Sequence, residues 1–588
     1  LKKEKTMKLG KRIVSMLLVL VFILSLAGIS LAKEEGEPVE GNLIKIGTLA
    51  DFEKGTLTGL EATASDASDG ALRLAAGGTE GEYVSQVFAV EPFEYLVASW
   101  NAQVPAGTSV EIMARAYVDM KDAWTEWLSW GQWTRDIAKR KSANTDTELA
   151  GVNTDVFTVY GSDGETASLV QLKAVLRTDD PAVTPVLEQV AATYRNTLDG
   201  QAIQPTLTYS LYEGELPEKV EPNCPAISQM VREPSIAEVM CSATTICTIL
   251  DAHGEDLLPE QVALLCYDSE YEGFGNWAYS VAAAGMFGYD AYVQYADFDV
   301  LRNELANGNP VGISVRYSAS QNGSYPYLEN GAANNTAGHL ITITGYETVD
   351  GVEYFYSSDA AAGSDASCLR RYRADQLDEA WSGRVAYIVH EKQDPSVNPI
   401  ETVEASLVPV EGEENVYKLD TDAINLNAAF RTNSLKTAGA GIACVTIDGQ
   451  DAVPDAEKLP VVLKANRVFK YTINPDKDGG INFSPNRLMG AAEPGETWTF
   501  RLYVMTNDGK YVETTLDVTK PAEEATPAPA ETEAPAETPA GSPEATEEPA
   551  APAAAEESGS GSVVVIVIVA IVVLLAAAYL IFRKKKNS

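Results

Sequence analysis

The chain has 588 residues, a formal net charge of −40 and hydrophobic side chains at 45% of its positions. That length predicts about three folded domains, and the excess of 84 acidic over 44 basic residues argues against a nucleic-acid partner, because phosphate binding needs a basic surface. Six cysteines are too few for a disulfide scaffold, and three histidines leave little room for a multi-histidine metal site. The sequence implies no metal and no organic cofactor.

Residues 1–32 have the pattern of a secretory signal peptide with a short upstream extension before Met7. Basic residues lie between positions 7 and 12, and a mostly apolar run extends from Met16 to Ile29. Small residues then occupy the two positions that determine cleavage, Ser30 and Ala32. A signal anchor is the alternative to a cleaved peptide.

Residues 43–197 are expected to form an all-β sandwich domain. Apolar and polar side chains alternate over Tyr83–Val90 and Ser109–Ala116, and turn signals stand at Pro105-Ala106-Gly107 and Asp163-Gly164.

Four of the eight tryptophans of the chain fall within ten residues of this domain: Trp124, Trp127, Trp130 and Trp133. They are either a platform on which sugar rings stack or the core and corner of the sandwich. We favour the core.

The candidate chemistry lies between residues 205 and 392. Cys241–Gly254 is predicted to be a helix that ends at glycine and begins at Cys241. The helix dipole favours an anion at that end and lowers the pKa of a thiol, as a nucleophile requires.

Two strands are predicted to follow in this segment. Gly338–Tyr346 places His339 at the leading edge of the first strand, and Val352–Asp359 returns along it after a turn at Asp350-Gly351. A thiol, an imidazole and a carboxylate that orients the imidazole are the components of a cysteine nucleophile system.

The hairpin geometry sets a condition on Asp359. A two-residue turn at Asp350-Gly351 places Asp359 opposite Thr342, which is roughly 10 Å along the strand from His339. A longer turn or a bulge is therefore required, and Asp365 is the weaker substitute.

The remaining histidines and cysteines have structural interpretations. We expect His253 to end the Cys241 helix and His390 to close a final strand. The sequence does not decide whether the other cysteines pair or are buried thiols: Cys224, Cys247, Cys266, Cys368 and Cys444.

This segment resembles the papain-like cysteine peptidases related to bacteriocin-processing (double-glycine leader) endopeptidases, in their secreted Gram-positive form. The front domain is also similar to one that precedes such peptidases, through residues 99–101, 105–107, 124–127 and 131–133. The stretches that carry the main resemblance are 228–230, 238–242, 275–277, 338–346 and 358–359.

The resemblance implies a papain-like fold and four roles. Cys241 matches the nucleophile, His339 the general base and acid, Asp359 the residue that orients the imidazole, and Gln229 the side-chain donor of the oxyanion hole. The family often has tryptophan before the nucleophile, where this chain has Met240.

The rest of the chain is expected to be a β-rich domain, a stalk and an anchor. Residues 401–520 are β-rich, as in 461–464 and 497–504, and Asn474–Gly479 is interpreted as a plain turn because Pro485 replaces the glutamate of a calcium loop. Residues 521–562 are rich in Pro, Ala and Glu and should remain disordered. The apolar run 563–582 is long enough to span a bilayer, and the basic tail 583–588 places its end in the cytoplasm.

The leading hypothesis is a membrane-anchored, extracellular cysteine peptidase that acts on peptides or proteins. The alternative is a catalytically degenerate papain-like protein that binds carbohydrate or protein through its β-domains, so a cell-surface glycan is a further candidate partner. An amidase or transglutaminase would keep the triad and change the acceptor.

Overall fold

The computed structural model describes residues 35–65, 68–161, 164–198, 200, 202–232, 236–404, 407–409, 417–419, 439–451, 482–483, 489–505 and 510–520. The predicted signal peptide, stalk, span 563–582 and tail lie outside these residues, as do the strand over 461–464 and the turn over 474–479. None of the helices within the described ranges has the length and apolar character needed to cross a bilayer.

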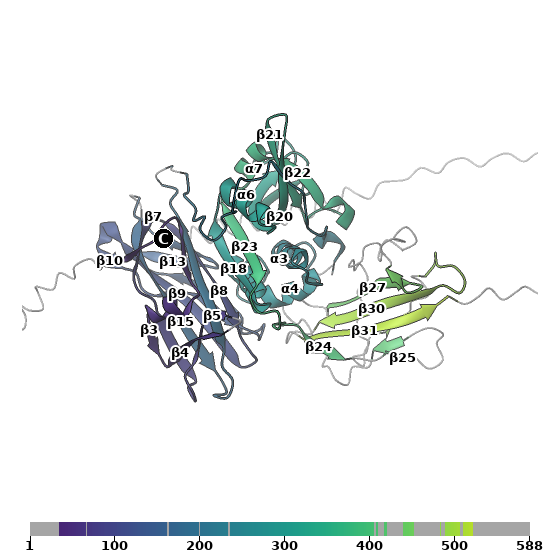
Figure 1. Ribbon diagram of the computed structural model, residues 1–588, viewed down its shortest axis with the longest axis horizontal. Coiled ribbons are helices and arrows are strands. Elements are labelled where there is room, and N and C mark those ends of the chain that lie inside the picture. The colour runs from purple at the N-terminus through teal and green to yellow at the C-terminus, as the bar shows by residue number, and fades with distance from the viewer. Residues whose placement is uncertain are drawn as a thin grey trace, which may run out of the picture. The chain divides into compact units, whose positions relative to one another are not determined.

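Two eight-stranded sheets form the first β-rich part (Figure 1). Short helices α2 (Leu49–Glu53) and η1 (Asp119–Lys121) lie in the connections. The first sheet contains β1 (Glu37–Pro38), β7 (Phe88–Phe93), β15 (Ala167–Thr178), β6 (Glu80–Val84), β3 (Thr56–Thr58), β9 (Thr108–Val118), β10 (Ala123–Trp124) and β11 (Leu128–Thr134). The second contains β12 (Asn144–Asp146), β13 (Ala150–Asn153), β14 (Val156–Val159), β8 (Tyr95–Gln103), β16 (Val186–Arg195), β5 (Ser68–Leu74), β4 (Leu60–Ser65) and β2 (Leu43–Ile46).

The alternating segment Tyr83–Val90 lies in strands, as expected, but it divides between β6 and β7, which both pair with β15. At the break, the Ser85 N–H donates to the Leu172 carbonyl, and the Ser85 hydroxyl accepts the Leu172 N–H, both at 2.9 Å. A side-chain oxygen thus replaces a backbone carbonyl in the ladder. The strand over Ser109–Ala116 and the turn at Pro105-Ala106-Gly107 are confirmed.

The tryptophan cluster divides into two pairs. Trp130 and Trp133 are fully buried, as the core interpretation expects. Trp124 and Trp127 are only partly buried, and the guanidinium of Arg115 lies 4.7 Å and 4.9 Å from their ring centroids. Lys173 also lies over the Trp127 ring, at 4.6 Å. These two rings therefore take part in cation–π contacts within the domain.

A seven-stranded antiparallel sheet and five α-helices follow. The sheet order is β18 (Tyr289–Tyr295), β23 (Val385–Lys392), β19 (Val311–Ser318), β20 (Asn335–Val349), β21 (Val352–Ser358) and β22 (Leu369–Arg373), with β17 (Lys219–Val220) also on β20. The helices are α3 (Cys241–Ala252), α4 (Pro259–Cys266), α5 (Trp277–Met286), α6 (Phe298–Ala306) and α7 (Ala374–Ala380), and η2 (Gln229–Val231) and η3 (Asp365–Ser367) are single 3-10 turns. Helix α3 packs against β20, α4 and α5.

Side chains of the sandwich cap the free edge of this sheet. Strand β18 is an edge strand, and Asn101 of β8 binds both backbone groups of Ala291: Oδ1 accepts its N–H at 3.1 Å, and Nδ2 donates to its carbonyl at 2.8 Å. Unpaired edge groups otherwise need water or another strand. Further along β18, the hydroxyl of Ser99 accepts the N–H of Val293. The hydroxyl of Thr193 accepts the N–H of Tyr295, and the amide of Asn42 donates to the Tyr295 carbonyl. One apolar cluster contains side chains from both parts.

The described residues after position 400 are largely strands, as predicted. One sheet has the order β24 (Glu401–Glu404), β31 (Lys510–Thr519), β30 (Thr497–Met505), β27 (Gly439–Ile447) and β28 (Gln450–Asp451). A smaller sheet contains β25 (Leu407–Pro409), β26 (Tyr417–Leu419) and β29 (Asn482–Phe483).

Candidate active site

Helix α3 begins at Cys241 and ends at Ala252, so the helix predicted over Cys241–Gly254 is confirmed. Met240 precedes it with no side-chain cap, and the chain leaves the helix at Gly254 with φ of 102°. Cys241 is partly exposed, which a nucleophile needs. The first N–H groups of a helix have no partner within it, so the backbone at Cys241 can donate to an anion.

His339 lies inside a strand rather than at its leading edge. Strand β20 begins at Asn335, four residues before the imidazole, and His339 pairs with Val315 of β19. The ladder between β19 and β20 is irregular between Val315 and Tyr317, immediately beside this pair. The early start is possible because β19 continues to Ser318 and pairs with Asn335.

The hairpin after His339 contains both features on which the geometry depends. Asp350 and Gly351 form the two-residue turn, with φ of 52° and 77°, as a type I′ hairpin requires. The pairing between β20 and β21 then shifts between Ile343 and Gly345, where β20 carries one extra residue. This is the bulge that the sequence argument required.

The bulge changes the face on which Asp359 lies. Thr342 pairs with Ser358 instead of Asp359. Asp359 is the next residue after Ser358, so the antiparallel register places it opposite Ile341. Ile341 is two residues from His339 and shares its face of the strand, whereas Thr342 points to the other face, because side chains alternate with a period of two. Without the extra residue, the carboxylate would point away from the imidazole.

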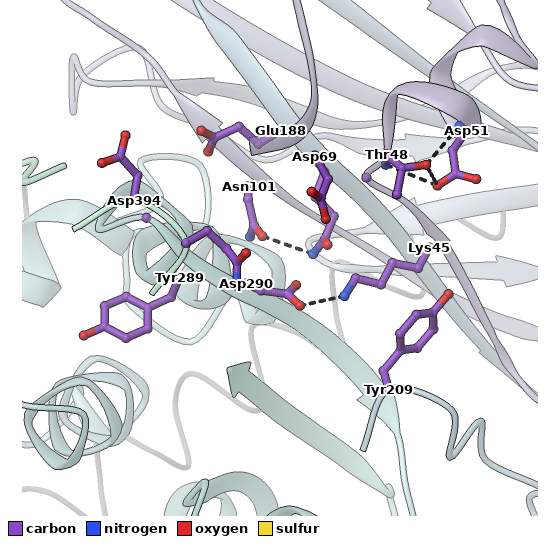
Figure 2. Close-up of a pocket in the computed structure, with 14 residues that line it drawn as sticks. Lys45, Thr48, Asp51, Asp69, Asn101, Glu188, Tyr209, Tyr289, Asp290 and Asp394 are labelled. Carbon is purple, nitrogen blue, oxygen red and sulfur yellow. Dashed lines mark hydrogen bonds and ion pairs between the residues drawn. The ribbon is translucent and has the colours of Figure 1, made fainter. Parts of the chain in front are cut away.

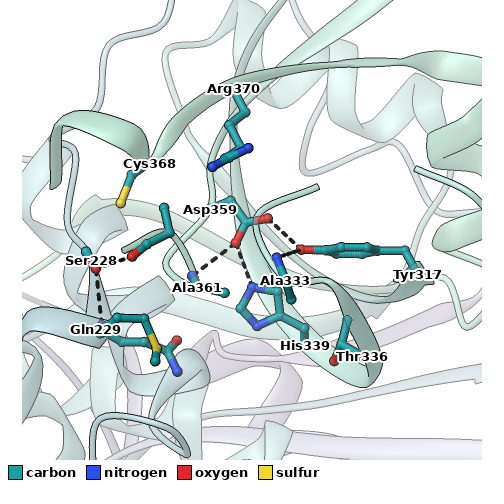
Figure 3. A network of polar contacts seen from close by, with 12 residues as sticks. Ser228, Gln229, Tyr317, Ala333, Thr336, His339, Asp359, Ala361, Cys368 and Arg370 are labelled. Carbon is teal, nitrogen blue, oxygen red and sulfur yellow. Dashed lines mark hydrogen bonds and ion pairs between the residues drawn. The ribbon is translucent and has the colours of Figure 1, made fainter. Parts of the chain in front are cut away.

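Asp359 is completely buried and accepts four hydrogen bonds, of which those from His339, Ala361 and Tyr317 appear in Figure 3. His339 Nε2 lies 2.8 Å from Oδ1, and the N–H of Ala361 donates to the same oxygen at 3.1 Å. The hydroxyls of Tyr317 and Tyr372 donate to Oδ2 at 2.9 Å and 2.8 Å. A carboxylate held this way fixes the ring plane of His339 and leaves Nδ1 for the thiol.

The electrostatics of the three side chains favour a charged pair. Burial opposes ionisation of His339, but the Asp359 charge and the hydrogen bonds to Asp359 and Cys241 raise its pKa to about 10. Burial also opposes ionisation of Asp359, yet the charge of His339 and its hydrogen bond lower that pKa to about 2. For Cys241, burial raises the pKa, and the hydrogen bond and charge of His339 outweigh it, so the pKa falls below its usual value. A thiolate beside an imidazolium is therefore favoured.

Gln229 lies in the single turn η2 and is buried. Its Nε2 donates to the carbonyl of Ala237 at 2.8 Å. An amide nitrogen carries two hydrogens, so one remains for a substrate oxygen. Gln229 Oε1 is buried and has no hydrogen-bond partner in the part of the chain that the structure describes.

Asp365 supports Gln229 instead of replacing Asp359. Its Oδ1 accepts the N–H of Ser228 at 2.7 Å, and the Ser228 hydroxyl donates to the carbonyl of Ala362. The segment that follows Asp359 thereby fixes the segment that carries Gln229.

The other candidates have structural positions. His253 ends helix α3, as expected. His390 lies in the last strand of the sheet and binds Glu304 at 2.8 Å and Asp290 at 3.3 Å. Cys224, Cys266 and Cys368 are free thiols, and burial raises the pKa of each. Cys247 is buried within helix α3. Nothing is described of the Cys444 side chain.

A polar cavity of about 280 Å³ lies elsewhere, where β2, β16 and β18 meet (Figure 2). Lys45 reaches across it to Asp290 at 2.6 Å, and Glu188, Asp69 and Asp394 also line it. No residue of the proposed triad is among its lining residues. The described residues contain no group of three or more His, Cys, Asp or Glu side chains that could hold a metal ion.

Comparison with known proteins agrees with this geometry. Residues 222–388 match the family described as "Peptidase_C39 like family", and residues 43–194 match "Peptidase C39 N-terminal domain". Segments 43–194 and 222–388 thus correspond to the N-terminal and peptidase domains of C39-like, papain-like cysteine peptidases. No curated protein was found to match the sequence.

Two solved structures show weak overall likeness. Digestive procathepsin L 3 of Tenebrio molitor larval midgut is 12% identical with a TM-score of 0.23, over 30% of this chain and 71% of that one. The CBM22-1–GH10 modules of xylanase 10B of Clostridium thermocellum, complexed with xylohexaose, are 9% identical with a TM-score of 0.16, over 33% of this chain and 32% of that one. TM-scores this low establish no shared fold.

Sequence reasoning missed the residues that support the C39-like site. Tyr317 and Tyr372 bind Asp359 from β19 and β22, and nothing in their local sequence distinguishes them from ordinary strand tyrosines. The bulge had a visible signal in Gly345, because a glycine inside a strand pattern often marks a bulge or a close approach of backbones. A Cβ at Gly345 would lie 2.4 Å from the carbonyl oxygen of Val220.

Proposed function

We propose that the protein is a cell-surface cysteine peptidase in which Cys241, His339 and Asp359 form the catalytic triad. The observation that carries the proposal is the buried Asp359 carboxylate 2.8 Å from Nε2 of His339. The position of Cys241 at the start of helix α3 and the lowering of its thiol pKa by His339 support it further. The match of residues 222–388 to a peptidase family gives the reaction class.

The reaction divides into two displacements. The Cys241 thiolate attacks the peptide carbonyl, forming a C–S bond, and the carbonyl oxygen becomes an oxyanion held by Gln229 Nε2 and the Cys241 N–H. The imidazolium of His339 gives its Nδ1 proton to the leaving amine as the C–N bond breaks. His339 then takes a proton from water, the hydroxide attacks the thioester, and the C–S bond breaks to release the acid and the thiolate.

Placement at the cell surface is proposed from the sequence. The signal-like residues 1–32, the apolar run 563–582 and the basic residues 583–586 support an extracellular catalytic part anchored by one span. A membrane-impermeant lysine reagent applied to intact cells tests this: lysines before position 521 should react, and Lys584–Lys586 should react only after lysis.

Thiol labelling is the direct test of the triad. Limiting iodoacetamide over a range of pH, followed by mass spectrometry, should modify Cys241 fastest, with an apparent pKa well below about 8.5. The buried thiols Cys224, Cys266 and Cys368 serve as internal controls in the same sample. The opposite result is labelling of Cys241 with an ordinary thiol pKa, unchanged in His339→Ala. That result would mean that the site is catalytically inactive.

Activity itself is tested with a peptide library and Cys241→Ala. The variant should fold normally and lose turnover, because the thiolate supplies the bond that forms. A Cys241→Ala protein that still cleaves contradicts the assignment. Product analysis decides between hydrolysis and transfer: free carboxylates indicate a peptidase, and new amide products indicate a transglutaminase.

A further inference from the structure

The sandwich reaches the peptidase part at the start of helix α5. Asp155 is the second residue of the two-residue turn between β13 and β14, and its Oδ2 accepts the N–H of Trp277, the first residue of α5, at 2.8 Å. The side-chain oxygen of the Asn276 cap accepts the N–H of Tyr279. Asp155 is itself held in place, since Trp130 Nε1 donates to its carbonyl at 2.8 Å. A carboxylate from another part of the chain thus binds a helix N–H that has no partner within the helix.

Neighbouring sandwich residues hold the loop that precedes this helix, residues 267–276. Asp268 is fully buried, and its Oδ1 accepts the N–H of Ser142 of the sandwich at 2.9 Å, while Oδ2 accepts Asn276 Nδ2 at 2.9 Å. The buried guanidinium of Arg140 donates to two carbonyls in the last turn of α4 at 2.7 Å each. Sandwich residues 140–142 therefore fix the start of the loop, and Asp155 fixes its end.

The first turn of α5 contacts the first turn of the catalytic helix. Ser280 Oγ lies 2.7 Å from Ser242 Oγ, and it donates to the carbonyl of Asn276 at 2.8 Å. Ser242 directly follows Cys241, and its backbone N–H is one of the groups that lower the pKa of the Cys241 thiol. A short series of contacts thus connects Asp155, Trp277, Ser280 and Ser242 to the sulfur.

We propose that Asp155 is a positioning residue of the peptidase site: it fixes Trp277, and so holds the first turn of α5 against Ser242 beside Cys241. This inference rests on the proposed peptidase function. It makes the sandwich a structural part of the active site rather than a spacer or a substrate-recruiting module alone.

The test compares three variants of the full chain: Asp155→Ala, Asp155→Asn and Ser280→Ala. Iodoacetamide reports the reactivity of Cys241 without needing a bound peptide, and peptide hydrolysis gives kcat and KM separately. Asp155→Ala and Ser280→Ala should slow alkylation and lower kcat by about tenfold to a hundredfold, with KM little changed. Asp155→Asn should remain within about threefold of wild type, because the amide oxygen still accepts the Trp277 N–H.

Asp179→Ala, an exposed carboxylate of the same sandwich, is the matched control and should behave as wild type. Wild-type rates in folded Asp155→Ala, or equal losses in the alanine and asparagine variants, overturn the proposal. If Asp155→Ala does not fold, Ser280→Ala decides: slowed alkylation supports the proposal and wild-type alkylation overturns it. A wild-type protein that is alkylated quickly but cleaves no peptide refutes the proposed function, and the alkylation rates still decide the role of Asp155.

Discussion

The backbone N–H of Gln229 donates to the carbonyl of Ala360 at 2.9 Å, and Ala360 directly follows Asp359. The residue proposed for the oxyanion hole is thus held by the residue next to the carboxylate that orients His339. Asp365 strengthens this link by accepting the N–H of Ser228. One short segment, 359–365, therefore supports both the proton-transfer side and the oxyanion side of the site.

Gln229→Ala should reduce kcat for peptides while leaving alkylation of Cys241 nearly unchanged. Removing one oxyanion donor typically costs about 3–4 kcal/mol, or roughly two to three orders of magnitude in kcat. Alkylation by iodoacetamide forms no oxyanion, so its rate depends on the thiolate alone. Parallel measurement of the two rates separates a missing donor from a misplaced thiol. Equal losses in both rates would show that Gln229 acts through the position of Cys241.

Asp359→Asn should raise the apparent pKa of Cys241 in thiol labelling and lower kcat by roughly two to four orders of magnitude. The Asp359 charge is what raises the pKa of His339 to about 10, and the charged imidazole is what lowers the pKa of the thiol. Without the charge of Asp359, the Cys241 thiolate forms only at higher pH. Labelling rates from pH 5 to pH 10 check the shift.

The control for this substitution is Asp365→Asn, which keeps an acceptor for the Ser228 N–H. Its labelling curve should coincide with that of wild type, because Asp365 accepts the Ser228 N–H, whereas the imidazole of His339 binds Asp359. A shift as large as that of Asp359→Asn would move the orienting role to Asp365.

The local parts of the site could be predicted from the sequence. Cys241 before a helical pattern, and Asp-Gly between two apolar strands, are signals that depend only on neighbouring residues. The two-residue turn and the helix start both occur as expected. The position of Asp359 could not be derived the same way, because it depends on one extra residue in β20 that reverses the alternation of side chains.

The contacts between the sandwich and the catalytic sheet were not predictable for a different reason. Asn101 and Ala291 are 190 residues apart, and each has an ordinary strand environment in the sequence. Only the pairing of whole sheets brings the Asn101 amide to the edge of β18. Long-range contacts of this kind leave no periodicity in a single sequence.

Asn101→Ala should lower the free energy of unfolding by about 1–3 kcal/mol. The substitution removes the acceptor of the buried Ala291 N–H, whereas the Ala291 carbonyl keeps the donor Gln189 Nε2 at 3.3 Å. The shift in Tm measures the loss. Asn322→Ala, at an exposed loop position, is the matched control and should change stability by less than about 0.5 kcal/mol. Equal Tm values for both variants would show that water replaces the Asn101 amide at the edge.

His390 should make the stability of the protein fall at alkaline pH. Burial opposes its charge, but hydrogen bonds to Asp290 and Glu304 and their charges raise the pKa of His390 to about 9. Lys45 shares Asp290 from the sandwich side at 2.6 Å, and the ring of Tyr292 packs against the imidazole. Because the folded pKa lies above the unfolded value of about 6.5, the stabilisation is fully present below pH 6.5 and is lost as the pH rises through 9.

The measurement is Tm between pH 6 and pH 10 for wild type and His390→Gln. A pKa difference of that size corresponds to about 3 kcal/mol, so the variant should be clearly less stable at pH 6, and the difference should shrink toward pH 10. His253→Gln is the control, because burial lowers the pKa of His253, so its titration cannot cause a loss of stability at alkaline pH. A stability difference between wild type and His390→Gln that stays constant with pH would mean that the imidazole contributes packing and neutral hydrogen bonds rather than a charge between Asp290 and Glu304.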